Sequence, residues 1–70
     1  MPAGKLKWWS AGRGFGFIAQ DAGGPDMFLH FSDLSAAGID PQGIKIGDRL
    51  TFEIGSTRDD KPKAINVRRA

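Results

Sequence analysis

Apolar and polar residues alternate in short stretches of the chain, and turn-forming residues separate each stretch from the next. A period of two is typical of a β-strand, which sends successive side chains to opposite faces. We therefore predict five strands, over residues 5–9, 14–20, 26–30, 49–54 and 63–68. No stretch sustains the period of an ordinary helix, so the pattern indicates an all-β protein.

The connections between these strands are mostly turns and loops. Residues 21–25 contain two glycines and a proline, which predicts a tight turn and hence a hairpin. Phe31 to Leu34 can close a single helical turn, with Ser32 as its N-cap. Residues 35–45 show no sustained period, and we interpret them as a long loop.

Five short strands without a covering helix are best accommodated by a small closed barrel. Residues 1–4 should be frayed, since nothing in them can pack, and the consecutive Trp8 and Trp9 predict a bulge where the alternation is lost. One face of each strand supplies the side chains that fill the barrel. The predicted core consists of Leu6, Ile18, Met27, Leu29, Leu50, Phe52, Ile54, Ile65 and Val67.

The second and third predicted strands are apolar on both faces, whereas a hairpin usually has one polar face. Phe15 and Phe17 share a face of one strand, and Phe28 and His30 share a face of the other. The reverse assignment would place these rings inside the barrel. A barrel of five short strands cannot hold four more rings beside its aliphatic set, and an inward His30 would need a buried partner. We therefore predict that the rings lie on the outer surface.

The length of 70 residues predicts a single domain over residues 1–70, with an ordered core over about residues 5–69. The chain has no cysteine, which excludes disulfides and thiolate metal sites and is compatible with a reducing cytoplasm. No apolar run approaches the roughly 18 residues that a membrane span requires. We expect a cytoplasmic protein without a membrane segment or a secretory signal.

The formal net charge is +2, which suits an anionic partner. The first twenty residues contain no acidic side chain, and further cations cluster near the C-terminus at Lys61, Lys63, Arg68 and Arg69. Exposed rings beside cations fit unpaired nucleobases, because stacking on an aromatic ring is worth about 1–3 kcal/mol per base. Duplexes fit poorly because their bases are already stacked. Gly14 and Gly16 would let another backbone or a ligand approach closely.

Two motifs resemble the cold-shock domain family, and the resemblance runs from about Lys5 to Arg69. The first is Lys7-Trp8-Trp9-Ser10 with Arg13-Gly14-Phe15-Gly16-Phe17-Ile18, and the second is Asp26-Met27-Phe28-Leu29-His30-Phe31-Ser32. The resemblance implies an antiparallel five-stranded oligonucleotide-binding barrel (OB-fold) that binds single-stranded RNA and DNA.

Site residues follow from the resemblance position by position. It implies stacking platforms at Trp8, Phe15, Phe17, Phe28, His30 and Phe31. It also implies that Lys7 and Arg13 meet phosphates and that Asp26 accepts hydrogen bonds from a base. Pro62 and Lys63 match a contact region before the last strand.

The chain departs from the family pattern at a few positions. Trp9 and Ser10 stand where the family usually has Phe and Asn, which keeps a ring but replaces an amide that could read a base edge. Gly12 stands where a charged residue is common. Ile39 falls near a loop position that is often aromatic, and the loop from 38 to 47 is slightly longer than usual. These departures imply weaker binding with little effect on the fold.

Other site types fit the sequence less well. An RNA-recognition motif also uses an R-G-F-G-F-type strand, but its partner strand comes first and two helices cover its sheet. Gly14-x-Gly16-x-x-Ala19 formally matches a dinucleotide fingerprint, which needs a preceding strand and a following helix. His30, Ser32 and Asp33 are the residue types of a catalytic triad. A triad, however, depends on the spatial roles of its members, which near neighbours in sequence do not establish. We expect no catalytic residue, no metal and no cofactor.

The remaining alternative from another functional class is a protein-docking barrel, since exposed rings can also anchor a protein partner. Binding through phosphates weakens as salt rises, whereas an aromatic protein interface changes little, so a salt titration separates the two. The sequence favours a non-enzymatic, monomeric binder of single-stranded RNA and DNA that acts like an RNA chaperone. Bases stacked on the protein are unavailable to a duplex, which would keep RNA unpaired and regulate gene expression.

Overall fold

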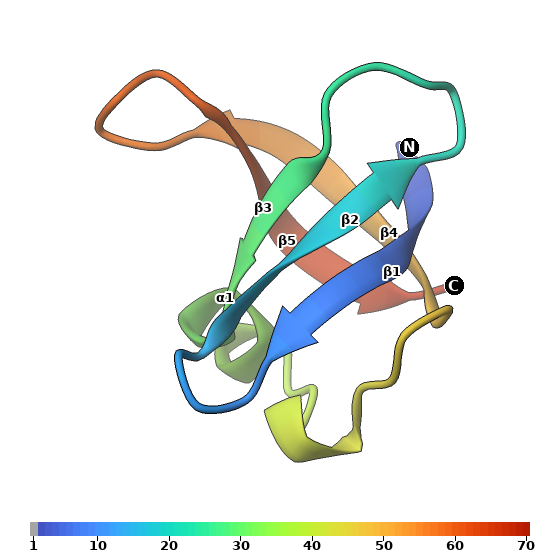
Figure 1. Ribbon diagram of the computed structural model, residues 1–70, viewed down its shortest axis with the longest axis vertical. Coiled ribbons are helices and arrows are strands. Elements are labelled where there is room, and N and C mark those ends of the chain that lie inside the picture. Colours follow the sequence, from blue (N-terminus) through green and yellow to red (C-terminus); the bar gives the residue numbers. More distant parts are fainter. Residues whose placement is uncertain (1) are drawn as a thin grey trace.

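The chain forms a closed five-stranded β-barrel in a computed structural model that describes residues 2–70 (Figure 1). The strands are β1 (Ala3–Ser10), β2 (Phe15–Gln20), β3 (Met27–His30), β4 (Arg49–Ser56) and β5 (Pro62–Arg69). Helix α1 (Phe31–Ala36) and the 3-10 helix η1 (Pro41–Gly43) lie between β3 and β4 in the chain. The predicted all-β fold, a small closed barrel of OB type, is confirmed.

The strands follow the order β1-β2-β3-β5-β4 around the barrel, and β4 pairs with β1 to close it. All neighbouring strands are antiparallel except β3 and β5, which run parallel and meet at Phe28 and Lys63. The antiparallel description therefore holds for every pair but this one. The exception arises because the chain crosses from β3 through both helices and β4 before it returns to the neighbouring position as β5.

Strand β1 begins earlier than the sequence predicted. Ala3 pairs with Thr51, and Gly4 pairs with both Gln20 and Leu50, so the expectation of a frayed end is wrong for Ala3 and Gly4. These two residues lie between β2 and β4 and close the barrel. Met1, which shared that expectation, lies outside the described residues.

The predicted bulge at the two tryptophans is confirmed by a register shift between Leu6 and Trp8 in the pairing of β1 with β2. Gly16 faces this irregular segment. A Cβ atom on Gly16 would clash with the Trp8 carbonyl oxygen, so the missing side chain permits close strand approach. Gly14 has a φ of 74° and lies against the Phe31 ring. Both glycines therefore serve packing within the protein.

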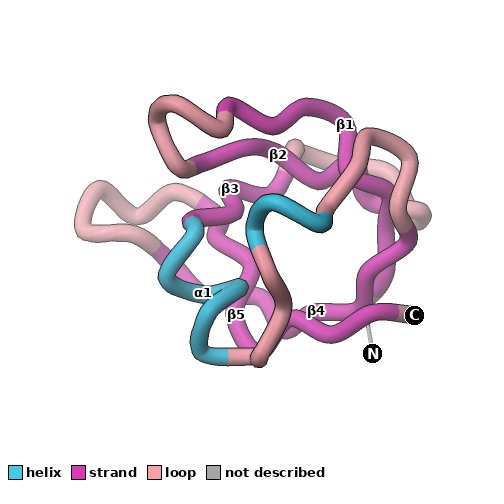
Figure 2. Tube along the Cα trace, turned by 90° about the horizontal axis from the view of Figure 1, so that it is seen from below, coloured by secondary structure: helices cyan, strands magenta, loops and turns pink. Residues whose placement is uncertain are grey.

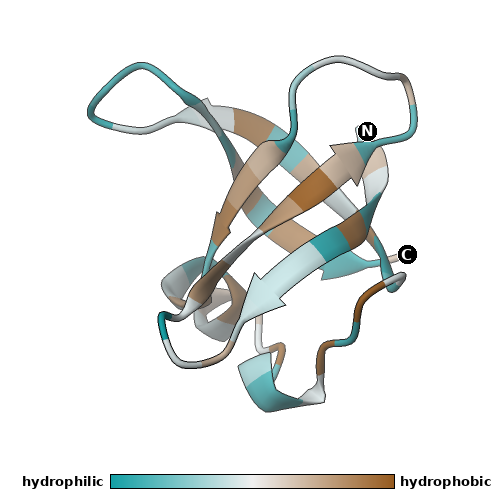
Figure 3. Cartoon of the chain, viewed as in Figure 1, coloured by the Kyte–Doolittle hydropathy of each residue, from teal (hydrophilic) through white to brown (hydrophobic). Residues whose placement is uncertain are grey.

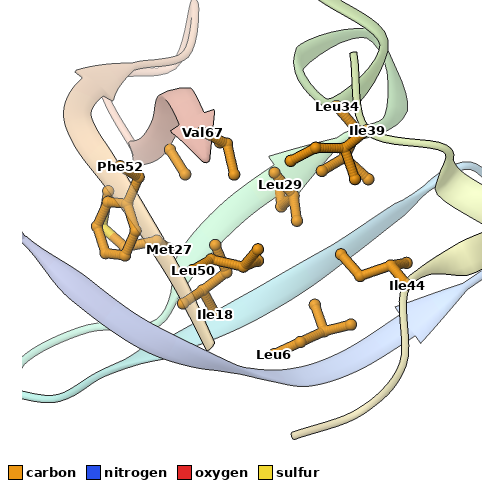
Figure 4. Close-up of a cluster of buried hydrophobic side chains, with 11 residues drawn as sticks. Leu6, Ile18, Met27, Leu29, Leu34, Ile39, Ile44, Leu50, Phe52 and Val67 are labelled. Atoms are coloured by element: carbon orange, nitrogen blue, oxygen red, sulfur yellow. The ribbon is translucent and has the colours of Figure 1, made fainter. Parts of the chain in front are cut away.

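Within residues 2–70, eleven residues form the buried hydrophobic core (Figure 4). Seven of them confirm the prediction: Leu6, Ile18, Met27, Leu29, Leu50, Phe52 and Val67. The other four core residues were not predicted, and they are Leu34, Ile39, Ile44 and Ala64. Three of these come from α1 and the segment interpreted as a loop, which lies across one end of the barrel (Figure 2).

The core prediction is wrong for two residues. Ile54 is 60% exposed and Ile65 is only half-buried. Asn66 has a φ of 49°, and the pairing of β4 with β5 shifts register between Thr51 and Glu53. This irregularity makes Ala64 and Val67 the inward residues of β5 and leaves Ile65 outside. Ile54 lies near the end of β4, where the β4–β5 hairpin projects from the barrel (Figure 1).

Helix α1 confirms the predicted helical turn but not its cap. The N-cap is His30, whose side chain accepts a hydrogen bond from the Ser32 backbone N–H. Ser32 lies in the first turn, so its assignment as N-cap is wrong. The chain enters the helix directly from β3, which leaves the last strand residue to cap it. The long segment after α1 contains η1, capped by Asp40, whose carboxylate accepts from the Gln42 N–H.

Neither helix of residues 2–70 is long and apolar enough to cross a membrane. Within the same residues, no three histidine, aspartate or glutamate side chains come together as a group that could hold a metal ion.

Candidate nucleic-acid interface

Six ring-bearing side chains gather on the outer surface of β1, β2 and β3, and we refer to them as the aromatic face. They are Trp8, Phe15, Phe17, Phe28, His30 and Phe31. The strand register explains why residues from three segments meet. Phe15 pairs with His30 and Phe17 with Phe28, while the bulge places Trp8 opposite Phe17. Paired residues project to the same side of a sheet, so the rings become neighbours.

The rings of the aromatic face contact one another as a continuous set. The Phe15 ring lies 5.6 Å from the rings of Trp8 and Phe28, measured between centroids. The His30 ring extends the set, at 6.2 Å from Phe28 and 4.6 Å from Phe31. These separations fall within the range in which aromatic pairs attract one another. Each ring is therefore supported by at least one other ring before any ligand arrives.

The aromatic face lies outside the core, as the sequence predicted. Trp8 is 42% exposed and Phe31 is 47% exposed. Phe15, Phe17, Phe28 and His30 are half-buried, and none of them belongs to the core cluster. The reverse assignment, with Ile18, Met27 and Leu29 outside, is wrong because all three are fully buried. Much of β2 and β3 is coloured hydrophobic in Figure 3, whereas the β4–β5 loop is hydrophilic.

Trp9 does not join the aromatic face although it follows Trp8 in the chain. It is half-buried, packs against the core and lies beside Gly16. Together with Ala11, Phe31, Pro41 and Gln42 it lines a small pocket next to the aromatic face. Consecutive strand residues point to opposite faces, and the bulge between Leu6 and Trp8 makes Trp8 the surface ring and Trp9 the packing ring.

Two of the three predicted cationic contacts are already paired with acids. The Lys7 ammonium lies 3.0 Å from the Asp26 carboxylate, and the Lys63 ammonium lies 3.5 Å from that of Asp33. Arg13 is exposed and has no ion pair within residues 2–70. The sequence predicted a phosphate contact for Lys7 and a base contact for Asp26. It did not predict their ion pair, because Lys7 lies in β1 and Asp26 in the turn before β3.

Ser10 lies at the β1–β2 turn, where its carbonyl oxygen accepts hydrogen bonds from the backbone N–H groups of Arg13 and Gly14. It pairs with Phe15 across the sheet and so lies at the rim of the aromatic face. Ile39, the loop residue at a position often aromatic in the family, is buried in the core at 8% exposure. It therefore contributes no ring and no contact surface to this site.

A pocket extends the aromatic face toward the projecting β4–β5 hairpin. Phe17, Phe28 and Asp26 form one side of it, and Thr57, Asp59, Lys61 and Pro62 form the other. The sequence identified Pro62 by resemblance and Lys61 as one of the cations near the C-terminus, but it missed Thr57 and Asp59. No sequence pattern signalled them, because the hairpin meets β3 only through the crossover that makes β3 and β5 neighbours.

The residue types of a catalytic triad do not form a relay. His30 Nδ1 lies 2.8 Å from the Ser32 hydroxyl oxygen, whereas the Asp33 carboxylate pairs with Lys63. A triad requires the carboxylate to orient the imidazole, and here it is engaged elsewhere. What the site offers is a set of supported ring faces with few free charges, which suits flat unsaturated ligands.

Comparison with known proteins places this geometry in context. A sequence profile described as the 'Cold-shock' DNA-binding domain matches residues 2–70. Cold shock protein ScoF of Streptomyces coelicolor is 44% identical over 68 residues, which cover 96% of both chains. Cold shock-like protein CspA of Rickettsia typhi is 42% identical over 65 residues, 93% of this chain and 89% of that one. Cold shock protein 1 of Arabidopsis thaliana is 38% identical over 64 residues, which are 91% of this chain but only 21% of that protein.

Proposed function

The chain belongs to the 'Cold-shock' DNA-binding domain family, and from this premise we propose that it binds single-stranded RNA and DNA by stacking bases on the aromatic face. The family is nucleic-acid-binding and non-catalytic. The observation that carries the proposal is the continuous run of ring contacts from Trp8 through Phe15 and Phe28 to Phe31. Every base has a flat face that can stack on such a ring, whatever its sequence.

Stacking supplies most of the proposed affinity. Each stacked base contributes about 1–3 kcal/mol, so three or four bases give a gross gain of about 3–12 kcal/mol. Ordering the flexible strand offsets part of that gain. The rings already contact one another, which reduces the cost of arranging the protein side of the complex. The expected dissociation constants lie in the range from about micromolar to tens of nanomolar.

The charges support a secondary, phosphate-directed contribution. Lys7 and Lys63 are partly neutralised by Asp26 and Asp33, whereas Arg13 is exposed and free of an acidic partner within residues 2–70. We expect a shallow dependence of affinity on salt, since each phosphate contact adds a slope of only about −0.7 for a single strand. Asp26 lines the pocket beside Phe17 and Phe28, which supports our proposal that it accepts a hydrogen bond from a base edge.

The biological role we propose is that of a monomeric, cytoplasmic RNA chaperone that needs no cofactor, with residues 1–70 acting as one domain. Bases held on the aromatic face are removed from competing duplexes, so structured RNA would be kept unpaired. This mechanism consumes no nucleoside triphosphate, because the free energy of binding itself opposes base pairing within the RNA. The same face could regulate gene expression by holding a message open.

Fluorescence of Trp8 tests the proposal directly. Titration with a seven-nucleotide homopolymer should quench the emission, since a stacked base contacts the indole. A Trp9→Phe variant removes the second indole and serves as the control that assigns the signal. The complementary duplex should give little change. Equal response to the duplex, or none to any single strand, would contradict the proposal.

A protein-docking role for the same face is the competing function, because Trp8 and Phe31 are large and exposed. The two functions differ in their response to oligonucleotides. Binding of a short single strand that weakens with salt and with loss of a ring supports the nucleic-acid function. A protein that binds no oligonucleotide at low salt would leave docking as the better explanation of the exposed rings.

A further inference from the structure

His30 belongs both to the aromatic face and to the start of α1. Its ring lies 6.2 Å from Phe28, nearly parallel to it at 26°, and 4.6 Å from Phe31. The same ring is the N-cap of α1. Unlike the phenylalanines around it, the imidazole carries two polar nitrogens on its edge. The contacts of one nitrogen therefore decide what the other can do.

The Nδ1 nitrogen of His30 is an acceptor. The backbone N–H of Ser32 donates to it at 3.2 Å, and the Ser32 hydroxyl oxygen lies 2.8 Å away. A backbone N–H can only donate, so Nδ1 must present its lone pair. The hydroxyl then donates to that lone pair as well. A neutral imidazole with a lone pair on one nitrogen carries its proton on the other, which makes Nε2 a donor.

We infer that His30 presents Nε2–H to the bound strand as a fixed hydrogen-bond donor that selects an oxygen acceptor on a nucleotide, and that Ser32 is the positioning residue for it. The inference rests on the proposed function. Within residues 2–70 no group accepts a hydrogen bond from Nε2. The neighbouring rings of Phe28 and Phe31 offer no acceptor of their own, so the donor is left for a ligand.

The chemistry of the partner follows from this polarity. An oxygen lone pair of a base carbonyl or of a phosphate satisfies Nε2–H, whereas an amino group at the same place would set a donor against a donor. The contribution of one such hydrogen bond corresponds to about a two- to tenfold change in affinity. His30 would thus add selectivity to a surface that otherwise recognises ring faces without regard to sequence.

Two substitutions at position 30 separate the roles of the side chain. His30→Phe keeps a ring for stacking but loses both nitrogens. His30→Asn keeps an N-cap acceptor, since asparagine is a favoured N-cap residue, but loses the ring. Ser32→Ala removes the hydroxyl and retains the backbone donor. Phe15→Ala is the matched control, because it removes a stacking ring while the Nδ1 contacts of His30, which are with Ser32, stay in place.

The decisive measurement uses the free wild-type protein. His30 is the only histidine in the chain, so two-bond proton–nitrogen spectra of labelled protein contain one imidazole pattern. At alkaline pH we expect a protonated Nε2 and an unprotonated Nδ1. Ser32→Ala should raise the share of the other tautomer, and Phe15→Ala should leave the tautomer unchanged. A proton on Nδ1 in the wild type would overturn the inference without any binding experiment.

Binding of a seven-nucleotide thymidine strand gives the second readout. His30→Phe should bind about two- to tenfold more weakly than the wild type although its ring remains. Replacing thymine oxygens by sulfur should weaken the wild type but not His30→Phe if the acceptor is a base. Methylphosphonate linkages should weaken binding of the wild type but not of His30→Phe if the acceptor is a phosphate. If His30→Phe binds like the wild type, His30 only stacks, and the inference fails while the proposed function stands. Failure of the wild type itself to bind would instead remove the proposed function.

Discussion

The β2–β3 wall and the β4–β5 wall enclose the same core but differ on their outer surfaces. Outside β2 and β3 stand four rings, whereas the outer positions of β4 and β5 include Glu53 and Asn66, which hydrogen-bond to each other at 2.9 Å. Both walls bury an aliphatic or aromatic inner set completely. The barrel therefore does not need the outer rings to close. The difference teaches that the aromatic face is surplus to the core, which is what a binding surface requires.

The largest expected effect comes from removing the inner aromatic side chain. Phe52 is fully buried on β4, and Phe52→Ala should cost about 3–5 kcal/mol of unfolding free energy. A core of this size supplies only about 3–5 kcal/mol in all, so the variant should be largely unfolded in denaturant titrations and by circular dichroism. Phe28→Ala is the same chemical change on an outer position and should stay folded. Equal loss of stability in the two variants would erase the distinction between the walls.

The next largest effect is on binding. Phe17→Ala and Phe28→Ala should each weaken binding of a short single strand by about 1–3 kcal/mol, because each removes a stacking ring. Fluorescence or calorimetric titration measures this loss, and thermal unfolding of the same samples shows that the barrel persists. If the variants instead lose stability, but bind like the wild type under conditions in which they are folded, the rings serve packing.

A smaller effect should follow from releasing Lys7. Asp26→Asn removes the partner of the 3.0 Å ion pair and frees the ammonium for a phosphate. We expect affinity at low salt to change by no more than about threefold, since loss of a base-edge acceptor opposes the gain, while the salt slope steepens by about 0.7. Lys7→Ala is the matched control and should not steepen the slope. An Asp26→Asn slope equal to that of the wild type would show that releasing Lys7 from its ion pair adds no phosphate contact.

The smallest effect is expected on the outer side of the other wall. Ile54 is exposed on β4, and Ile54→Thr should change the unfolding free energy by no more than about 0.5 kcal/mol. Oligonucleotide binding should be unchanged, because Ile54 is not part of the aromatic face. A marked loss of binding in this variant would extend the interface to the β4–β5 wall and end the comparison drawn above.

Alternation predicted the five strands and most of the core, and the limited volume of the barrel then predicted the outward orientation of the rings. It worked for Ile18, Met27 and Leu29 because regular strands place every second residue on the same face. It failed at Ile54 and Ile65, where the register shift and the positive φ of Asn66 interrupt the period. A bulge adds a residue to one strand only. The consecutive tryptophans marked the bulge in β1, whereas nothing in the hydrophobic pattern marked the irregularity between β4 and β5.

The candidate site, like the fold, could be predicted from the sequence only in part. Phe15, Phe17, Phe28 and His30 could be identified from the sequence because they lie in two regular, neighbouring strands. Trp8 and Phe31, which lie in β1 and α1, were identified by the family resemblance. Their ion pairs could not, since Lys7 with Asp26 and Lys63 with Asp33 join segments whose distance depends on the closed barrel. The same holds for Thr57, Asp59 and Lys61, which reach the aromatic face only because β5 runs beside β3.

By itself, the sequence determined the number and approximate positions of the strands, the inward side of the regular strands, and that six rings and several cations are candidates for contact with a ligand. Only the tertiary structure decided that Leu34, Ile39 and Ile44 complete the core and that His30 caps α1 through Nδ1. The physical reason is range. Strand periodicity depends on neighbours along the chain, whereas capping, ion pairing and closure of the barrel depend on atoms that folding brings together.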